Sequence, residues 1–265
     1  MRKNGFLSLL YHTVFIGFIV APLVVVILVS FTSKGYISMP FEDGFSLRWF
    51  RAVRDNTVII QAFWLSIWVG LASASVAVTI AVPGALALTR YKFPGRGAVM
   101  GFFMSPMMIP HVVLGVAFLR FFTSINVSGS FFWLAATHVV VILPYALRLV
   151  LSSATGLDRD AERAALSLGA SRFTVFRRIV LPLVLPGVVG GWMLAFIQSF
   201  DELTMTVFVA TPGTTTLPVA MYNQIAQTID PMVAAVATML IVGTLAVMIV
   251  MDRLVGLDRV LIGKG

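Results

Sequence analysis

The sequence contains no cysteine and only three histidines, and its charged residues make up 11% of 265 positions. Without cysteine the chain has no disulfide, no thiolate metal ligand and no thiol nucleophile. His12, His111 and His138 all lie in apolar runs, which argues against a His-rich metal site. So little charge also excludes an ordinary soluble domain, because a folded chain of this length needs more polar surface to cover its core. We therefore expect neither a metal site nor catalytic residues.

A phosphate-binding loop of the form G-x-x-x-x-G-K-[ST] is also missing. The C-terminal GLDRVLIGKG contains a Gly-Lys pair but lacks the glycine spacing and the hydroxyl residue. No nucleophile–base pair is recognisable either. We predict that the chain is not an enzyme and holds no cofactor, so the energy for any active process comes from another subunit.

Apolar residues dominate what is present: 59% of the chain is hydrophobic and the mean hydropathy is +0.97. A membrane-spanning helix needs about 20 such residues in a row. The sequence predicts an all-α membrane protein, a single domain over residues 1–265 with six transmembrane helices. The predicted spans lie near 13–31, 64–88, 98–119, 131–147, 179–200 and 232–251. The fourth is short and is expected to extend past Arg148, whose side chain can reach the interface.

The distribution of basic residues predicts the orientation of these spans. If the N-terminus is cytoplasmic, the inner segments hold 14 of the 19 Lys and Arg residues. The outer segments hold the other five: Lys34, Arg48, Arg51, Arg54 and Arg120. Both termini are therefore predicted to be cytoplasmic. Topology and anionic lipid explain the basic excess along the inner face, so no nucleic-acid partner is expected.

The stretch AERAALSLGASRFTVFRRIVLPLVLPG begins in the longest predicted cytoplasmic loop. Its pattern predicts two short helices. Asp158 or Asp160 caps the first, Gly169 ends it, and Ser171 caps the second. The apolar face of this helix pair must be buried, either against its own bundle or in a partner protein, and the pattern alone leaves both readings open.

The spacing Ala164-Ala165-x3-Gly169-x9-Ile179-x-Leu181-Pro182 resembles the EAA loop of the membrane subunits of binding-protein-dependent ABC importers. The resemblance implies the type I ABC importer permease (MetI-like) fold and a cytoplasmic coupling loop over residues 158–182. In that family the loop sits in a groove on the ATPase subunit. The implied coupling residues are Glu162, Ala164, Ala165, Gly169, Ile179, Leu181 and Pro182. The family's glutamate usually stands where this chain has Arg163, and Glu162, one residue earlier, points to another side of the helix.

The resemblance also implies the chain's partners and its location. The protein is expected in the bacterial inner membrane, as a multi-pass subunit surrounded by lipid. Its expected partners are a pair of ATP-binding subunits, a second and different permease chain, and a periplasmic substrate-binding protein. ATP and Mg would then be bound by the ATPase subunits.

Within this family, SFDELTMTVFVATPGTTTLPVAMYNQI at residues 199–225 resembles the spermidine/putrescine-type permeases. Those members place a serine and one or two acids at the outer end of the fifth span, which Ser199, Asp201 and Glu202 match. The spacing puts Gln198, Asp201 and Glu202 on one side of a helix. Acids at the edge of a span usually face a pathway, although solvation by periplasmic water is the alternative. We predict half of a translocation path for a small cationic amine such as putrescine or spermidine.

Two further residues are assigned to the substrate path. His111 follows Pro110 where several polyamine-type members carry an acid, which leaves room for an amino acid derivative, an opine or an aminophosphonate. Alternatively, His111 packs and bonds a backbone carbonyl freed by Pro110. Trp49, in a surface helix expected at 46–56, lines the outer mouth or anchors the interface. An ion-gradient secondary transporter is less favoured: such proteins usually show charged relays or broken helices at mid-membrane, and none of the predicted spans has an acid near its centre.

Overall fold

The computed structural model describes residues 5–41, 44–127 and 129–255, and every regular element in these ranges is helical. The all-α prediction is thus confirmed for the described chain. Arg2, Lys3 and the terminal GLDRVLIGKG lie outside the described residues. Two compact units make up the chain. Unit 1 combines the N-terminal residues through Ile60 with the described residues from Ala220 on, and unit 2 is Gln61–Val219.

Five helical stretches are long and apolar enough to cross a membrane, and a bent pair makes a sixth span if it counts as one. The five are Leu7–Ser30, Thr57–Arg90, Phe131–Thr155, Arg172–Phe200 and Met232–Ile249. They correspond to five of the six predicted spans. The fourth does extend past Arg148, to Thr155, as expected.

The third predicted span, near 98–119, corresponds to a bent pair of helices. Arg96–Met108 and His111–Ser124 meet there at an angle of 99°. The break follows from Pro110, because a proline disfavours helical dihedrals in the residue before it. Ile109 is accordingly extended, with φ −93° and ψ 128°. The break puts His111 at the first position of a new helix.

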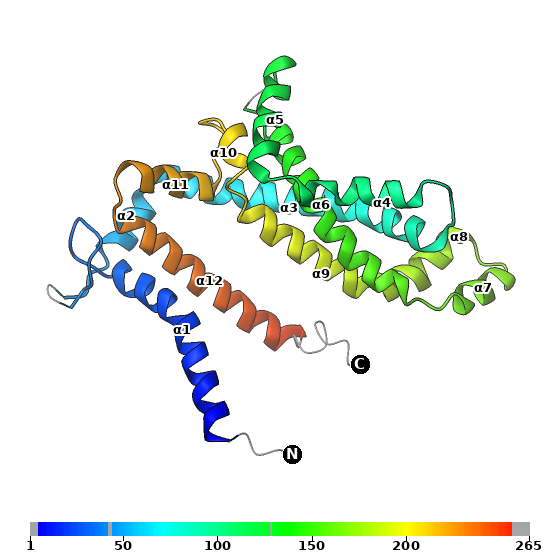
Figure 1. Cartoon of the computed structure of the whole chain (residues 1–265), viewed down its shortest axis with the longest axis horizontal. Helices are drawn as coiled ribbons and strands as arrows, with labels where there is room; N and C mark the ends of the chain where they lie inside the picture. The colour runs from blue at the N-terminus through cyan, green and yellow to red at the C-terminus, as the bar shows by residue number, and fades with distance from the viewer. Residues whose placement is uncertain (1–4, 42–43, 128, 256–265) are drawn as a thin grey trace. The chain divides into compact units, whose positions relative to one another are not determined.

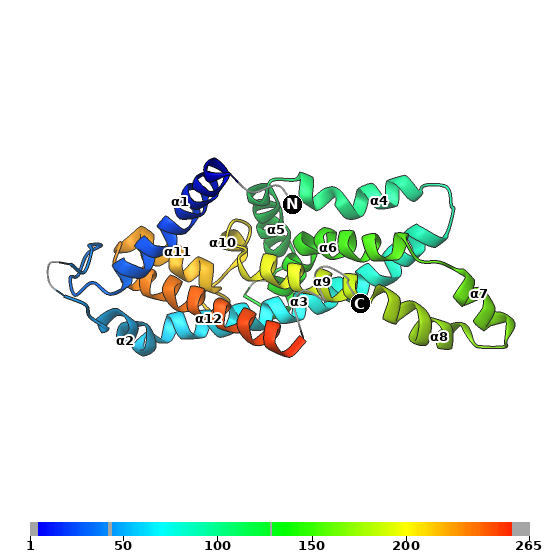
Figure 2. The same cartoon turned by 90° about the horizontal axis from the view of Figure 1, so that it is seen from below.

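Unit 2 contains the helices from α3 to α10 (Figures 1 and 2). Its elements are α3 (Thr57–Arg90, from Gln61 on), α4 (Arg96–Met104), the 3-10 turn Ser105–Met108, α5 (His111–Ser124), α6 (Phe131–Thr155), α7 (Asp160–Ser167), α8 (Arg172–Val175), the π-turn Phe176–Val180, α9 (Leu181–Phe200) and α10 (Thr206–Val209).

Small residues let the helices of unit 2 approach closely, as is usual for helix contacts in lipid. Helices α6 and α9 pack along one another. Gly187 and Gly191 stand where a Cβ atom on α9 would collide with the backbone of α6. Ala74 and Ala77 of α3 are completely buried in the same core. Ser73 adds a polar link, because its hydroxyl donates to the carbonyl of Ala135 at 3.0 Å.

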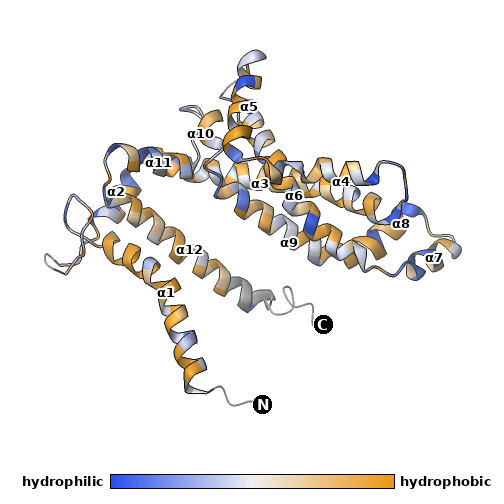
Figure 3. Cartoon of the chain, in the orientation of Figure 1, coloured by the Kyte–Doolittle hydropathy of each residue, from blue (hydrophilic) through white to orange (hydrophobic). Residues whose placement is uncertain are grey.

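Unit 1 contains α1 (Phe6–Ser30), α2 (Arg48–Asp55), most of α11 (Leu217–Gln227) and α12 (Met232–Val255). Helix α12 packs against both α1 and α2. Figure 3 shows α1 as apolar along much of its length, and Leu7, Phe15 and Phe18 are exposed. Exposed apolar residues of this kind are what a helix in contact with lipid presents.

Candidate functional site

The predicted coupling loop folds as two short helices joined by a tight turn. Gly169 ends α7 in the left-handed region, with φ +85°. The amide of Gly169 donates to the carbonyl of Leu166, and the amide of Ala170 donates to the carbonyl of Ala165. This pair of bonds is the Schellman motif, which satisfies carbonyls left free at a helix end. Ser171 then caps α8 by accepting from the amide of Thr174 at 3.2 Å. The helix end at Gly169 and the cap at Ser171 are confirmed.

Apolar side chains of this helix pair divide between an inner and an outer face. Ala165, Phe176, Ile179 and Leu181 pack against a buried cluster at the ends of α3, α6 and α9. Three large apolar side chains of the pair instead lie open, with exposed fractions from 45% to 88%: Leu166, Leu168 and Phe173. The sequence left open whether the apolar face packs on the protein's own bundle or on a partner. In the structure, one set of apolar side chains packs on the bundle and another set is exposed. Ala164, Gly169 and Pro182 are exposed as well.

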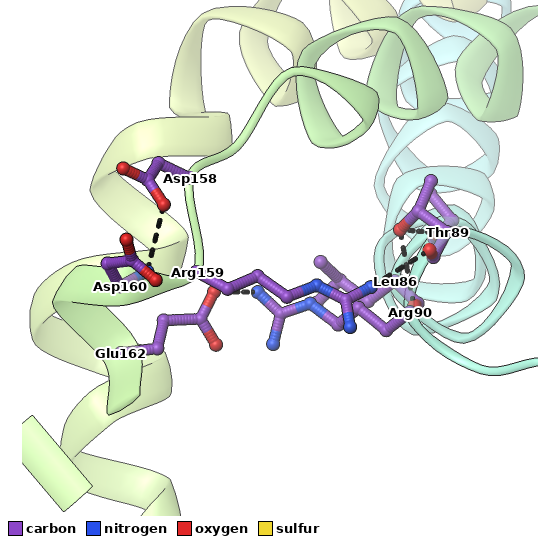
Figure 4. Close-up of polar contacts among 8 residues, drawn as sticks. Leu86, Thr89, Arg90, Asp158, Arg159, Asp160 and Glu162 are labelled. Atoms are coloured by element: carbon purple, nitrogen blue, oxygen red, sulfur yellow. Dashed lines mark hydrogen bonds and ion pairs between the residues drawn. The ribbon is translucent and has the colours of Figure 1, made fainter. Parts of the chain in front are cut away.

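The Glu162 side chain lies on the side of α7 that faces α3, and it does not share the exposed side of Arg163. Its carboxylate forms an ion pair with the Arg90 guanidinium at 2.5 Å, and the two side chains are only 12% and 23% exposed. Next to it, Arg159 donates to the main-chain carbonyl of Thr89 at 3.1 Å (Figure 4). Arg163, which stands in the place of the family's glutamate, is 72% exposed and lies 3.8 Å from Asp160.

At the other predicted site, the end of α9 separates the two acids. The helix ends at Phe200, so Asp201 is its C-cap residue and Glu202 lies beyond it. Asp201 is exposed, whereas Glu202 is 7% exposed. The expectation that Gln198, Asp201 and Glu202 share one helical face is wrong, because the helical periodicity ends before the acids are reached.

The buried carboxylate of Glu202 has partners on two sides. It accepts from the amide of Met205 at 2.7 Å, and it lies 2.7 Å from Nδ1 of His111. The alternative in which His111 bonds a freed backbone carbonyl is corrected by this contact. The break in the third span explains it, since α5 begins at His111 and packs against α10. His111 and Glu202 are thus brought together as one polar pair.

His138 is a buried residue that the sequence reasoning assigned to no site. One ring nitrogen lies 2.8 Å from the Ser199 hydroxyl, and the other lies 3.0 Å from the Thr206 hydroxyl. The ring therefore ties α6 to the end of α9 and to α10. A histidine inside an apolar run was the available signal, because a polar group buried in a span needs hydrogen-bond partners.

Trp49 belongs to unit 1 and is buried there. Its indole nitrogen donates to the carbonyl of Lys34 at 3.2 Å, and the guanidinium of Arg48 lies 5.1 Å from its ring centroid. The predicted surface helix is present as α2. Ser199, Glu202 and His111 belong to unit 2, whereas Trp49 belongs to unit 1.

Comparison with known proteins connects these features to a family. The sequence pattern described as "Binding-protein-dependent transport system inner membrane component" matches residues 77–256. The chain belongs to this family. It is a permease subunit of an ABC importer and resides in the bacterial inner membrane. Members of the family have no ATPase site of their own and work with ATPase and substrate-binding partners.

Individual relatives cover nearly the whole chain. The spermidine/putrescine transport system permease protein PotC of Escherichia coli (strain K12) is 32% identical over 259 residues, which is 98% of this chain and 95% of that protein. The putrescine transport system permease protein PotI of the same organism is 30% identical over 233 residues, covering 84% and 82%. A bacterial alginate ABC transporter, solved in complex with an alginate pentasaccharide-bound periplasmic protein, matches with a TM-score of 0.69 at 16% identity. That match covers 94% of each chain and supports the fold.

Proposed function

We propose that this permease subunit forms half of the translocation path for a small cationic amine such as putrescine or spermidine. Two relatives with putrescine in their names, PotC and PotI, support this substrate class. The observation that carries the proposal is an exposed acid, Asp201, at the end of α9, next in sequence to the buried Glu202. Asp201 has no ion-pair partner among the residues that the structure describes. Its carboxylate is free to receive an ammonium group.

A second substrate class is favoured by the pair of His111 and Glu202. The Glu202 carboxylate already accepts from the Met205 amide and contacts the His111 ring. Only one of the two neighbouring acids is then open to a cationic substrate. A substrate with one ammonium group and one acidic group, such as an amino acid derivative, an opine or an aminophosphonate, would use Asp201 and leave Glu202 in its pair.

The proposal for coupling is that α7 and α8 dock into a groove on the ATPase subunit. The exposed Leu166, Leu168 and Phe173 support it, since three large apolar side chains standing in water are unfavourable unless a partner covers them. The proposed assembly contains a pair of ATPase subunits that bind ATP and Mg, a second permease chain and a periplasmic binding protein. When the ATPase subunits close on ATP, α7 and α8 move with them and the substrate cavity opens outward. Hydrolysis resets it.

Uptake of labelled putrescine and spermidine by cells expressing the whole system tests the substrate. Asp201→Asn should raise the half-maximal concentration about tenfold or more, because a hydrogen bond to a charged group contributes about 1.5–3 kcal/mol. Asp55→Asn, which changes an exposed acid elsewhere, is the matched control. Uptake that is the same in both variants contradicts the role of Asp201. If neither amine is taken up while amino acid derivatives or aminophosphonates are, the second substrate class replaces the first.

Co-purification tests the coupling. Leu168→Glu replaces an apolar side chain that is 88% exposed by a charged one, so the fold of unit 2 should tolerate the change. Docking should fail, because the charge would be buried against the apolar groove of the ATPase. Tyr91→Glu, at a 65% exposed position just after α3, is the control. Loss of the ATPase from the Leu168 variant alone supports docking through α7 and α8. Equal retention of the ATPase in both variants contradicts it.

A further inference from the structure

The first turn of α7 is attached to the last turn of α3 by two polar contacts (Figure 4). One is the ion pair of Glu162 with Arg90, which joins residues 72 positions apart. The other is the hydrogen bond from Arg159 to the Thr89 carbonyl. That carbonyl is among the last four of α3, which have no partner inside the helix. A cation at this end of a helix is also favoured by the helix dipole.

The ion pair of Glu162 and Arg90 is largely shielded from water, so it is harder to break than an ion pair at the surface. Exposed ion pairs are weak because water screens them and long side chains must be immobilised. Here the Glu162 side chain is 12% exposed and that of Arg90 is 23% exposed. Removing one partner of such a pair leaves an uncompensated charge out of water, which is costly. A displacement of α7 therefore pulls on the end of α3 instead of breaking the contact.

The end of α3 is in turn continuous with the core of unit 2. Helix α3 runs without interruption to Arg90. Ala74, Ala77, Ala81 and Ala85 line one side of it at 0–1% exposure. They belong to the cluster shared with α6 and α9, so α3 cannot shift without moving residues packed against it. The Ser73 bond to Ala135 extends this connection to α6.

We propose that the pair of Arg90 and Glu162 is the joint that transmits the movement of α7 to α3, and so to the core of the permease. This role rests on the proposed docking of α7 and α8 on an ATPase. Glu162 is a positioning residue in this account: it acts inside the permease, while the exposed residues of α7 and α8 make the contact with the partner. Glu162 stands one residue before the position of the family's glutamate, and this offset turns it toward Arg90.

A double-mutant cycle in the complete reconstituted importer tests the joint. Glu162→Gln, Arg90→Gln and the double variant are compared for bound ATPase, basal ATP hydrolysis, and stimulation of hydrolysis by the loaded binding protein. Asp160→Asn is the matched control, since it makes the same acid-to-amide change in the first turn of α7 at an 81% exposed side chain. Its effect on the dipole of α7 is similar, but within the described residues its side chain makes an ion pair with Arg163 and no hydrogen bond or ion pair with α3.

We expect all variants to retain the ATPase and basal hydrolysis. Stimulation should fall about fivefold or more in the two single variants, the lower end of usual coupling energies. It should fall by the same factor in the double variant, and not in the control, because the two residues act as one unit. The double variant leaves no unpaired charge, so it remains decisive if a single variant fails to accumulate.

Three results overturn the joint. The first is stimulation in the double variant equal to that of wild type. The second is a loss in the double variant equal to the product of the losses in the single variants. The third is loss of the ATPase from the Glu162 variant alone. The last result would make Glu162 a docking residue. Absence of the ATPase from the wild-type complex, by contrast, refutes the proposed docking itself.

Discussion

Replacing Gly169 by alanine should weaken binding of the ATPase without disturbing any packed side chain. Gly169 ends α7 with φ +85°, where an L-residue with a Cβ is disfavoured. A Cβ atom built at this position has nothing within 4 Å. The cost of the substitution is therefore confined to the backbone, which makes the position suitable for a quantitative test.

The size of the effect follows from the conformation. Left-handed dihedrals cost a residue with a Cβ roughly 1–2 kcal/mol. That energy disfavours the observed turn between α7 and α8 by a factor of about 5–30. If the ATPase binds only this arrangement, its apparent dissociation constant rises by up to the same factor. Asparagine tolerates left-handed dihedrals better than alanine, so Gly169→Asn should cost less.

Titration of the purified ATPase subunit onto the detergent-solubilised permease complex measures the change. Gly156→Ala is the control, because Gly156 also has open space around it but has φ −91°. We expect the dissociation constant to rise in the order Gly156→Ala, Gly169→Asn, Gly169→Ala. Equal binding by the two alanine variants, or weaker binding by Asn than by Ala at 169, would refute the reasoning.

Two further predictions concern the packing of unit 2. His138→Phe removes two buried hydrogen bonds, each contributing about 0.6 kcal/mol on average inside a membrane protein. It should lower the thermal unfolding temperature in detergent, whereas His12→Phe at an exposed position should not; equal effects would contradict it. Gly115→Ala places a Cβ 2.7 Å from the Phe208 ring and 2.9 Å from a backbone oxygen, an overpacking that costs about 1–3 kcal/mol. The membrane content of this variant should fall below that of Gly101→Ala, which has open space; similar amounts would exclude the clash.

Local signals predicted the end of α7 and the start of α8 correctly, because caps depend on a few adjacent residues. At the start of α7, however, the N-cap residue is Arg159 and not the predicted Asp158 or Asp160, and the Arg159 side chain makes no capping hydrogen bond. Gly169 supplies the left-handed residue that closes α7, and Ser171 supplies the hydroxyl that opens α8. At the third span, the sequence predicted where the apolar segment lies but not the size of its bend. A hydropathy average over residues 98–119 does not register the extended residue before Pro110, although the two prolines there were visible in the sequence.

The pairing of charges could not be predicted in the same way. The spacing of Gln198 to Asp201 and Glu202 suggested one side of a helix, but α9 ends at Phe200, and Asp201 is exposed while Glu202 is buried. The partner of Glu202 is His111, which lies on a helix that exists only because the third span breaks. A sequence pattern describes neighbours along the chain, whereas these partners come from different helices.

The sequence by itself determined which segments are long and apolar enough to enter a membrane, since hydropathy is a sum over consecutive residues. It also determined the family, through the coupling loop and the match over residues 77–256. Only the tertiary structure decided which polar groups are satisfied within the permease and which remain open to a partner. Arg90 holds Glu162 and His111 holds Glu202, while Asp201, Leu168 and Phe173 stay exposed. The reason is that burial of a charge is stable only when folding brings an opposite charge or a donor to it, and those groups lie on different helices.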